Sequence, residues 1–479
     1  MNKKSVLKNL MWRFGERISA QLVTLVVSII LARKIAPEDY GAVAIIMVFI
    51  TIANVLVNNG FATALIQKKN ADNLDFSSVF FFSVAFSTAM YFSLFFAAPF
   101  IAQWYKMPIL CPTLRVLGVR IVIGAVNSVQ QSYVARNMIF KKFFLSTLGG
   151  TIGSAIIGII MAYAGCGIWA LIMQYLFNTT IDTVVLWFTV KWRPEKSFSF
   201  KRLVGLLSFG WKLLASALIG AVYDDLRTLI IGKVYSSTDL AYYSKGQQFP
   251  QIVMTNVNTS VSSVLFPVLS SMQDDYAKMA VASRKLIQML SGIVAPILLG
   301  IAAVATPLVR LLLTEKWLGC IPFLQICCIY YLVSAIYNVY LQSFKAIGKS
   351  GLALSMELVD DVIGIILVVL FYKRSVMAIA IVTLVSRGIA LIISAAANKK
   401  IFHASLRNQF KDITVPVMLS ILMFFFVELI GRLALNYIFV LALQIVGGTL
   451  FYAFLICLCK TPVYLELMGY FKKHMSQKI

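Results

Sequence analysis

Long runs of apolar residues, separated by short polar segments, dominate the chain. Most runs are about 20 residues long, which is the length an α-helix needs to cross the hydrocarbon core of a bilayer. Because lipid cannot satisfy backbone N–H and C=O groups, each run is expected to be helical. The sequence therefore predicts an all-α membrane protein with about 14 transmembrane helices. The runs lie near residues 10–33, 40–58, 76–103, 114–135, 145–164, 168–190, 203–234, 240–267, 286–313, 321–344, 352–372, 376–397, 413–433 and 436–459.

Composition excludes several other classes of protein. Of the 479 residues, 60% are hydrophobic and 13% are charged, whereas soluble domains carry about 25% charged residues. The formal charge of +24 comes from basic residues dispersed in short loops. No basic stripe is interleaved with aromatic residues, so we expect no nucleic-acid partner. The seven cysteines form no CxxC motif and are expected to be buried apolar residues.

The distribution of Lys and Arg among the loops predicts the orientation of the chain. The segment 191–202 and the tail around Lys472 and Lys473 are basic, whereas the loop 165–167 has no basic residue. Basic loops stay on the cytoplasmic side. With an even number of spans, both termini are expected in the cytoplasm.

Three short motifs recur in the same order at offsets of about 195 to 211 residues, the sign of an internal repeat. The unit is about six helices long, and because six is even, both copies share one orientation. We therefore expect an N-terminal lobe at 1–195, a C-terminal lobe at 196–405, and two further helices with a tail at 406–479. A pseudo-two-fold axis along the membrane normal would relate the lobes and leave a cleft between them. The motif pairs are Phe14-Gly15-Glu16-Arg17 with Phe209-Gly210-Trp211-Lys212, Gln131-Ser132-Tyr133-Val134-Ala135 with Gln342-Ser343-Phe344-Lys345-Ala346, and Ile168-Trp169-Ala170-Leu171 with Val376-Met377-Ala378-Ile379.

Several basic residues fall inside the apolar runs. A central Arg or Lys facing lipid costs about 2.5–3.5 kcal/mol, so such residues must line a wet cavity, pair with acids or reach the interface. In the run 114–135, Arg120, Asn127 and Gln131 follow helical spacing and share one face. The candidate residues of a cationic cavity are Arg13, Arg17, Arg120, Lys212, Lys245, Asn54, Asn127 and Gln131.

Structural interpretations remain open for these cations. Arg13 is close enough to the cytoplasmic interface to act as an anchor there, and Arg17 can pair with Glu16. Arg387 can pair with Glu357 or Asp360 inside the second lobe. If they line a hydrated cleft, the cations suit an anionic cargo, because moving a bare phosphate through hydrocarbon costs tens of kcal/mol.

Three further motifs are Trp12-Arg13-Phe14-Gly15, Ala36-Pro37-Glu38-Asp39-Tyr40-Gly41, and Asp225 with Ile230-Ile231-Gly232-Lys233. With these motifs the chain resembles the bacterial polysaccharide-unit flippases, the Wzx-like branch of the multidrug/oligosaccharidyl-lipid/polysaccharide exporter superfamily. This resemblance implies a flippase of the bacterial inner membrane. It would move an undecaprenyl-diphosphate-linked oligosaccharide to the external leaflet by alternating access, for O-antigen, capsule or exopolysaccharide assembly.

Related lipid II flippases imply a coupling-cation site in the second lobe. The matching acids here are Asp224 or Asp225 and Asp360 or Asp361, and their alternative role is to pair with Arg227 or Arg387. No cofactor is expected beyond Na+ or H+ as a coupling ion. The expected partners are the lipid-linked oligosaccharide, membrane lipid and a glycan polymerase machinery.

Two other functions compete with the flippase. A multidrug exporter of the same superfamily would favour cationic drugs, which the excess of intramembrane cations opposes. A glycan polymerase or ligase would need a large external loop, and no loop here has room for one. The only histidines, His403 and His474, lie in segments expected to be cytoplasmic. External histidine acid–base chemistry is therefore excluded, and we do not expect an enzyme.

Overall fold

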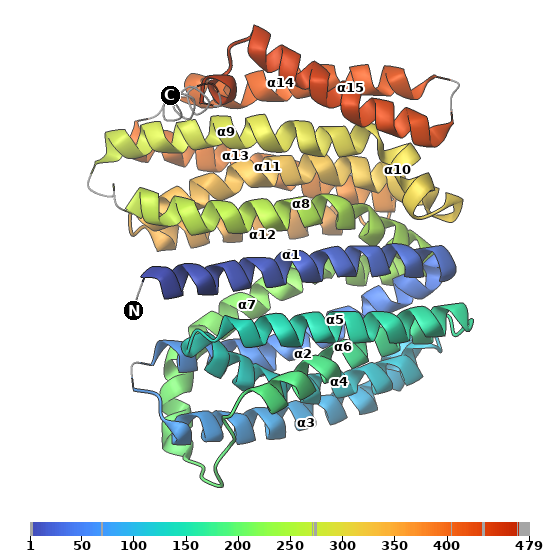
Figure 1. Cartoon of the computed structure of the whole chain (residues 1–479), viewed down its shortest axis with the longest axis vertical. Helices are drawn as coiled ribbons and strands as arrows, with labels where there is room; N and C mark the ends of the chain where they lie inside the picture. Colours follow the sequence, from blue (N-terminus) through green and yellow to red (C-terminus); the bar gives the residue numbers. More distant parts are fainter. Residues whose placement is uncertain are drawn as a thin grey trace. The chain divides into compact units, whose positions relative to one another are not determined.

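The computed structural model describes residues 3–68, 70–270, 272, 275–403, 405–433, 436–466 and 468. Side chains of residues 3–14, 16, 17, 59, 60, 63, 209, 212, 213 and 260–268 lie outside this description. Throughout the described part, the regular elements are helices (Figure 1). They are α1 (Lys3–Lys34), α2 (Pro37–Gln67), α3 (Asn73–Tyr105), α4 (Leu110–Arg136), α5 (Phe140–Tyr163), α6 (Ile168–Thr189), α7 (Phe200–Val234), α8 (Ser237–Ser270), α9 (Tyr276–Ala303), α10 (Ala305–Leu312), the 3-10 helix η1 (Glu315–Cys320), α11 (Ile321–Ala346), α12 (Ser350–Phe371), α13 (Val376–Phe402), α14 (Leu406–Gly431) and α15 (Tyr437–Leu458).

The described helices are built for a lipid environment. Nine segments among the described residues are long and apolar enough to cross a membrane, judged by length and composition. On α3, the large apolar side chains of Phe92, Phe96, Phe100 and Trp104 are all exposed. Their spacing of four residues places them on one helix face. Such a stripe is unfavourable in water and favourable against acyl chains. The prediction of an all-α integral membrane protein is confirmed at this level.

One predicted span is divided in the structure. The apolar run 286–313 forms two helices, because α9 ends at Ala303 and α10 begins at Ala305. Pro307 explains the break: its ring clashes with the carbonyl four residues earlier, that of Ala303, and it has no N–H to donate. Pro99 and Pro296, by contrast, remain inside α3 and α9.

The chain folds into two compact units, Met1–Ala241 and Tyr242–Ile479. In the first unit, α3 packs on α4, α4 packs on α6, and α6 packs on α5, while α7 lies against α2 (Figure 1). In the second unit, α9 packs on α11, α11 packs on α13, and α13 packs on α12. The same order of pairings thus occurs in each unit, and α14 and α15 pack on each other in the second.

The segment that follows α6 fixes the position of α6 against its neighbours. Trp192 is buried, and its indole N–H donates to Asn73 Oδ1 at 3.0 Å. Gln130 of α4 donates to the Trp192 carbonyl at 3.2 Å. The end of α6 is therefore held to α4 and to the start of α3. This contact sets which α4 and α6 side chains face each other deeper in the unit.

Candidate functional site

A polar cavity of about 500 Å³ lies within the first unit. Side chains from α2, α4 and α6 form most of its wall. Four of the residues that the sequence assigned to a cationic cavity line it: Asn54, Arg120, Asn127 and Gln131. They come together because α4 packs on both α2 and α6, so the polar face of α4 points between them.

Arg120 is the cation of this cavity. Its Nε donates to Thr179 Oγ1 on α6 at 2.7 Å, and Nη1 lies 3.8 Å from Met47 Sδ on α2. The guanidinium carbon stands 5.8 Å from the centre of the Tyr175 ring. Within the described residues, no carboxylate forms an ion pair with Arg120. A half-buried guanidinium held by neutral groups retains its full charge for an anionic ligand.

An acid and two amides form a second polar cluster in the same cavity. Asn127 Nδ2 donates to Asp182 Oδ2 at 2.6 Å, and Gln131 Nε2 donates to the same oxygen at 3.4 Å. Asp182 is on α6 and the two amides are one turn apart on α4. The cluster therefore ties α4 to α6 through hydrogen bonds to one carboxylate oxygen.

Gly150 on α5 allows α6 to approach closely behind Asp182. A Cβ atom at this position would lie 2.9 Å from the Asn178 carbonyl oxygen and 3.2 Å from the Asp182 Cβ. The first distance is shorter than real Cβ contacts, so any side chain here would push α6 away. Glycine at 150 thus helps to set the position of Asp182 in the cavity.

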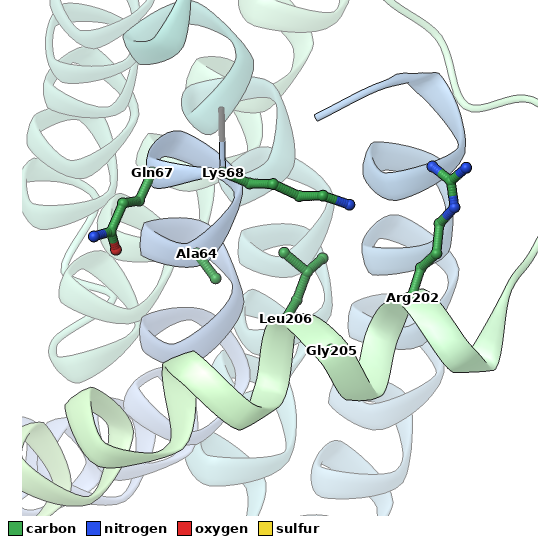
Figure 2. A pocket seen from close by; sticks show the side chains of 6 residues that line it. All are labelled: Ala64, Gln67, Lys68, Arg202, Gly205 and Leu206. Atoms are coloured by element: carbon green, nitrogen blue, oxygen red, sulfur yellow. The ribbon is translucent and has the colours of Figure 1, made fainter. Parts of the chain in front are cut away.

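A second cavity, of about 480 Å³, lies where α2 ends and α7 begins. Figure 2 shows Lys68 extending over Leu206, with Arg202 one turn closer to the start of α7. Both cations have acidic partners: Lys68 Nζ lies 2.6 Å from Asp75, and Arg202 pairs with Asp72. Outside the membrane spans, the Arg202 hydrogen bond lowers the pKa of Asp72 below its ordinary value. With its charges already neutralised, this cavity is less suited to an anion than the one at Arg120.

Of the other basic candidates, Lys245 is the one whose side chain the structure describes. The side chains of Arg13, Arg17 and Lys212 lie outside the described residues. Lys245 belongs to the second unit and is 5% exposed. Its Nζ donates to Gln248 Oε1 at 2.9 Å and stands 5.6 Å from the centre of the Trp317 ring.

The acids proposed for cation coupling include two that have arginine partners. Asp360 is buried and lies 3.1 Å from Arg387 Nη2, and it accepts a 3.0 Å hydrogen bond from Ser386 Oγ. Asp224 is exposed, 3.8 Å from Arg227. These are the pairings weighed above as the alternative to a cation site. The two remaining acids, Asp225 and Asp361, are half-buried.

Sequence reasoning did not single out Asp182. A signal for it exists in the run 168–190, where Gln174, Asn178 and Asp182 recur every four residues and so form one polar helix face. Asn178 and Asp182 both line the cavity. The pattern is as regular as the one on α4, and reading both faces together would have located the site.

Residues 30–322 match the model of a family described as polysaccharide biosynthesis proteins. This match covers more than half of the chain. The chain belongs to that family. The matched region contains all of α2, α4 and α6, and hence every wall residue of the cavity named above. The resemblance inferred from the sequence motifs is confirmed at the level of the family.

Two relatives of this polysaccharide biosynthesis family illustrate its range. The chain is 24% identical to the succinoglycan biosynthesis transport protein ExoT of Rhizobium meliloti (strain 1021), over 73% of this chain and 71% of that protein. It is also 24% identical to the lipopolysaccharide biosynthesis protein WzxC of Escherichia coli (strain K12), over 64% of this chain and 63% of that one.

Among solved structures, this chain is similar to the lipid II flippase MurJ in an inward closed conformation. The TM-score is 0.78 at 17% sequence identity, covering 96% of this chain and 100% of the MurJ chain. At that identity, the similarity establishes the fold. This member of the polysaccharide biosynthesis family thus has a helical fold like that of MurJ.

Proposed function

We propose that this chain is a flippase for undecaprenyl-diphosphate-linked oligosaccharide repeat units, used to assemble O-antigen, capsule or exopolysaccharide. The family, the transport protein named for succinoglycan and the MurJ-like fold all support this function. The observation that carries it is Arg120, a cation in a polar cavity with no acidic partner among the described residues. The function is transport, and no enzymatic step is part of the proposal.

The physical task explains why such a group is needed. A diphosphate carries negative charge, and bringing it into hydrocarbon without compensation costs tens of kcal/mol. Arg120 offers a fixed positive charge, and the neighbouring amides and hydroxyls offer hydrogen bonds that replace water. The acyl tail can stay in the bilayer while the headgroup crosses.

The proposed architecture follows the expectation from the repeats. All fourteen long helices would span the membrane, as two six-helix lobes (1–195 and 196–405) and a terminal pair in 406–479. The matching orders of helix pairing in the two units support this plan. Rocking of one lobe against the other would give alternating access, with both termini in the cytoplasm of a bacterial inner membrane. A glycan polymerase is the proposed partner that receives the exported units.

Replacing Arg120 tests the function directly. Arg120→Ala should lower the rate of translocation about 10- to 100-fold, the loss expected for a hydrogen bond to a charged group worth about 1.5–3 kcal/mol. The measurement is complementation in cells that lack their own copy. Wild type should restore surface polysaccharide, and the variant should leave lipid-linked units on the inner leaflet.

Arg115→Ala is the matched control, because Arg115 is on the same helix but outside the cavity wall. Its Nε donates to the Phe95 carbonyl at 3.3 Å, and it stacks on that ring. Translocation should therefore persist in this variant at unchanged membrane expression. Normal surface polysaccharide in Arg120→Ala would contradict the assignment of Arg120.

A further inference from the structure

Three buried oxygen atoms of the Arg120 cavity have no hydrogen-bond partner among the described residues. They are the Oδ1 atoms of Asn58, Asn127 and Asp182, and all three residues line the cavity. A buried acceptor left unsatisfied costs about 1–3 kcal/mol. Three on one cavity wall therefore point to a ligand, and because the Asp182 and Asn127 oxygens are acceptors, that ligand must supply hydrogen-bond donors or positive charge.

The orientation of the Asn127 amide is fixed by its neighbour. Its Nδ2 donates to Asp182 Oδ2 at 2.6 Å. Turning the amide over would place its oxygen against a carboxylate oxygen, which puts two acceptors together. Asn127 is 5% exposed, so its Oδ1 is a buried, oriented acceptor on the cavity wall. Asp182 likewise uses one carboxylate oxygen for the amides, and its other oxygen has no partner among the residues that the structure describes.

We propose that the three Oδ1 atoms of Asp182, Asn127 and Asn58 bind a monovalent hard cation, with Na+ as the probe. Oxygen ligands are what hard cations prefer. The cluster has one carboxylate, which matches one positive charge, and divalent ions usually take more. In the described part of the chain, no group of three His, Cys, Asp or Glu residues is placed to hold a metal. A proton on Asp182 would leave at least one amide oxygen unsatisfied, so it explains the cluster less well than a cation.

This cation site is separate from the contacts of Arg120. Arg120 binds Thr179, and in the described residues it forms no ion pair with Asp182. The site is also distinct from the acids at positions 224, 225, 360 and 361. Cation binding stands on this geometry alone. Its use in coupling rests on the proposed function: a bound cation neutralises Asp182, which leaves the charge of Arg120 to attract an anionic headgroup.

The test is binding by the purified full-length protein without transport substrate. Thermal unfolding is followed in NaCl and in choline chloride of equal ionic strength at one pH. Because a ligand that binds the folded state stabilises it, the wild-type midpoint should rise with Na+ and follow a saturation curve. Asp182→Asn should abolish the rise, and Asn127→Ala and Asn58→Ala should shift it to at least tenfold higher Na+. Glu315→Gln is the control, since Glu315 is exposed on η1 and should leave the rise unchanged.

Two results would overturn the site. One is a wild-type midpoint that does not respond to Na+ beyond choline, which includes a cavity that holds water alone. The other is an Asp182→Asn variant whose unfolding midpoint still rises with Na+ as in wild type. The same conclusion would follow if Asp225→Asn, and not Asp182→Asn, abolished that rise. If Asp182→Asn does not fold, radioactive Na+ bound by wild type and by the two amide variants decides the same question. Failure of flipping with Na+ binding intact would count against the proposed function and leave this site standing.

Discussion

Each unit of the chain holds an arginine among polar groups inside its helix bundle, and the two arginines differ in whether they pair with an acid. Arg387 in the second unit lies 3.1 Å from Asp360 and 2.9 Å from the Tyr330 hydroxyl. Arg120 in the first unit contacts Thr179 and Met47 and, among the described residues, forms no ion pair with an acid. A neutralised cation holds helices together, whereas one that keeps its charge is available to a ligand. The comparison therefore separates an arginine paired with an acid inside its bundle from the arginine that we propose binds the headgroup.

The two arginines lie on different members of helix pairs that follow the same packing order, α4 with α6 and α11 with α13. Arg120 and Tyr331 are each the eleventh residue of α4 and α11, and Thr179 and Arg387 are each the twelfth of α6 and α13. The arginine is thus on the first helix of the pair in one unit and on the second helix in the other. The acids differ as well: Asp360 comes from α12 and faces its arginine, but Asp182 comes from α6 and faces amides.

The largest expected effect comes from removing the acid of the structural pair. Asp360→Asn leaves Arg387 buried without its counter-charge, which should lower the free energy of unfolding by about 3–5 kcal/mol. The measurement is thermal or denaturant unfolding in detergent. A double variant, Asp360→Leu with Arg387→Met, should regain most of the stability because no buried charge remains. Equal stability of Asp360→Asn and wild type would show that the pair is not structural.

The next prediction gives Arg120 an acidic partner of the kind that Arg387 has in Asp360. Thr179→Asp places a carboxylate beside Arg120 Nε, where the hydroxyl now lies at 2.7 Å. The ion pair should neutralise the guanidinium and reduce translocation about tenfold or more, since hydrogen bonds to charged groups are worth about 1.5–3 kcal/mol. Thr179→Asn, similar in size but uncharged, is the control and should retain more activity. Translocation in the Asp variant equal to that of the Asn variant would argue against a role for the charge of Arg120.

The sequence predicted the helices and one wall of the site better than the contacts between helices. The face of α4 with Arg120, Asn127 and Gln131 follows from helical spacing alone, and the structure places all three on one cavity. Whether Asp182 or Asp360 faces an arginine depends on how separate helices are rotated and aligned. Spacing within one helix does not contain that information. The sequence left both roles open for Asp360 for this reason.

The smallest effect is expected at an ion pair of the same chemistry that is exposed. Arg202 and Asp72 have side chains 38% and 51% exposed, so their pair should contribute much less to stability than the buried pair of Asp360 and Arg387. Because the Arg202 hydrogen bond lowers the pKa of Asp72, this contribution is present above the ordinary Asp pKa of about 3.9 and is lost as the pH falls through the lower folded value. Arg202→Ala should raise the pKa of Asp72 and reduce the loss of stability on acidification, measured as the unfolding midpoint from about pH 5 to pH 3. A loss as large as that of Asp360→Asn would break the comparison, because burial would then not be what distinguishes the two pairs.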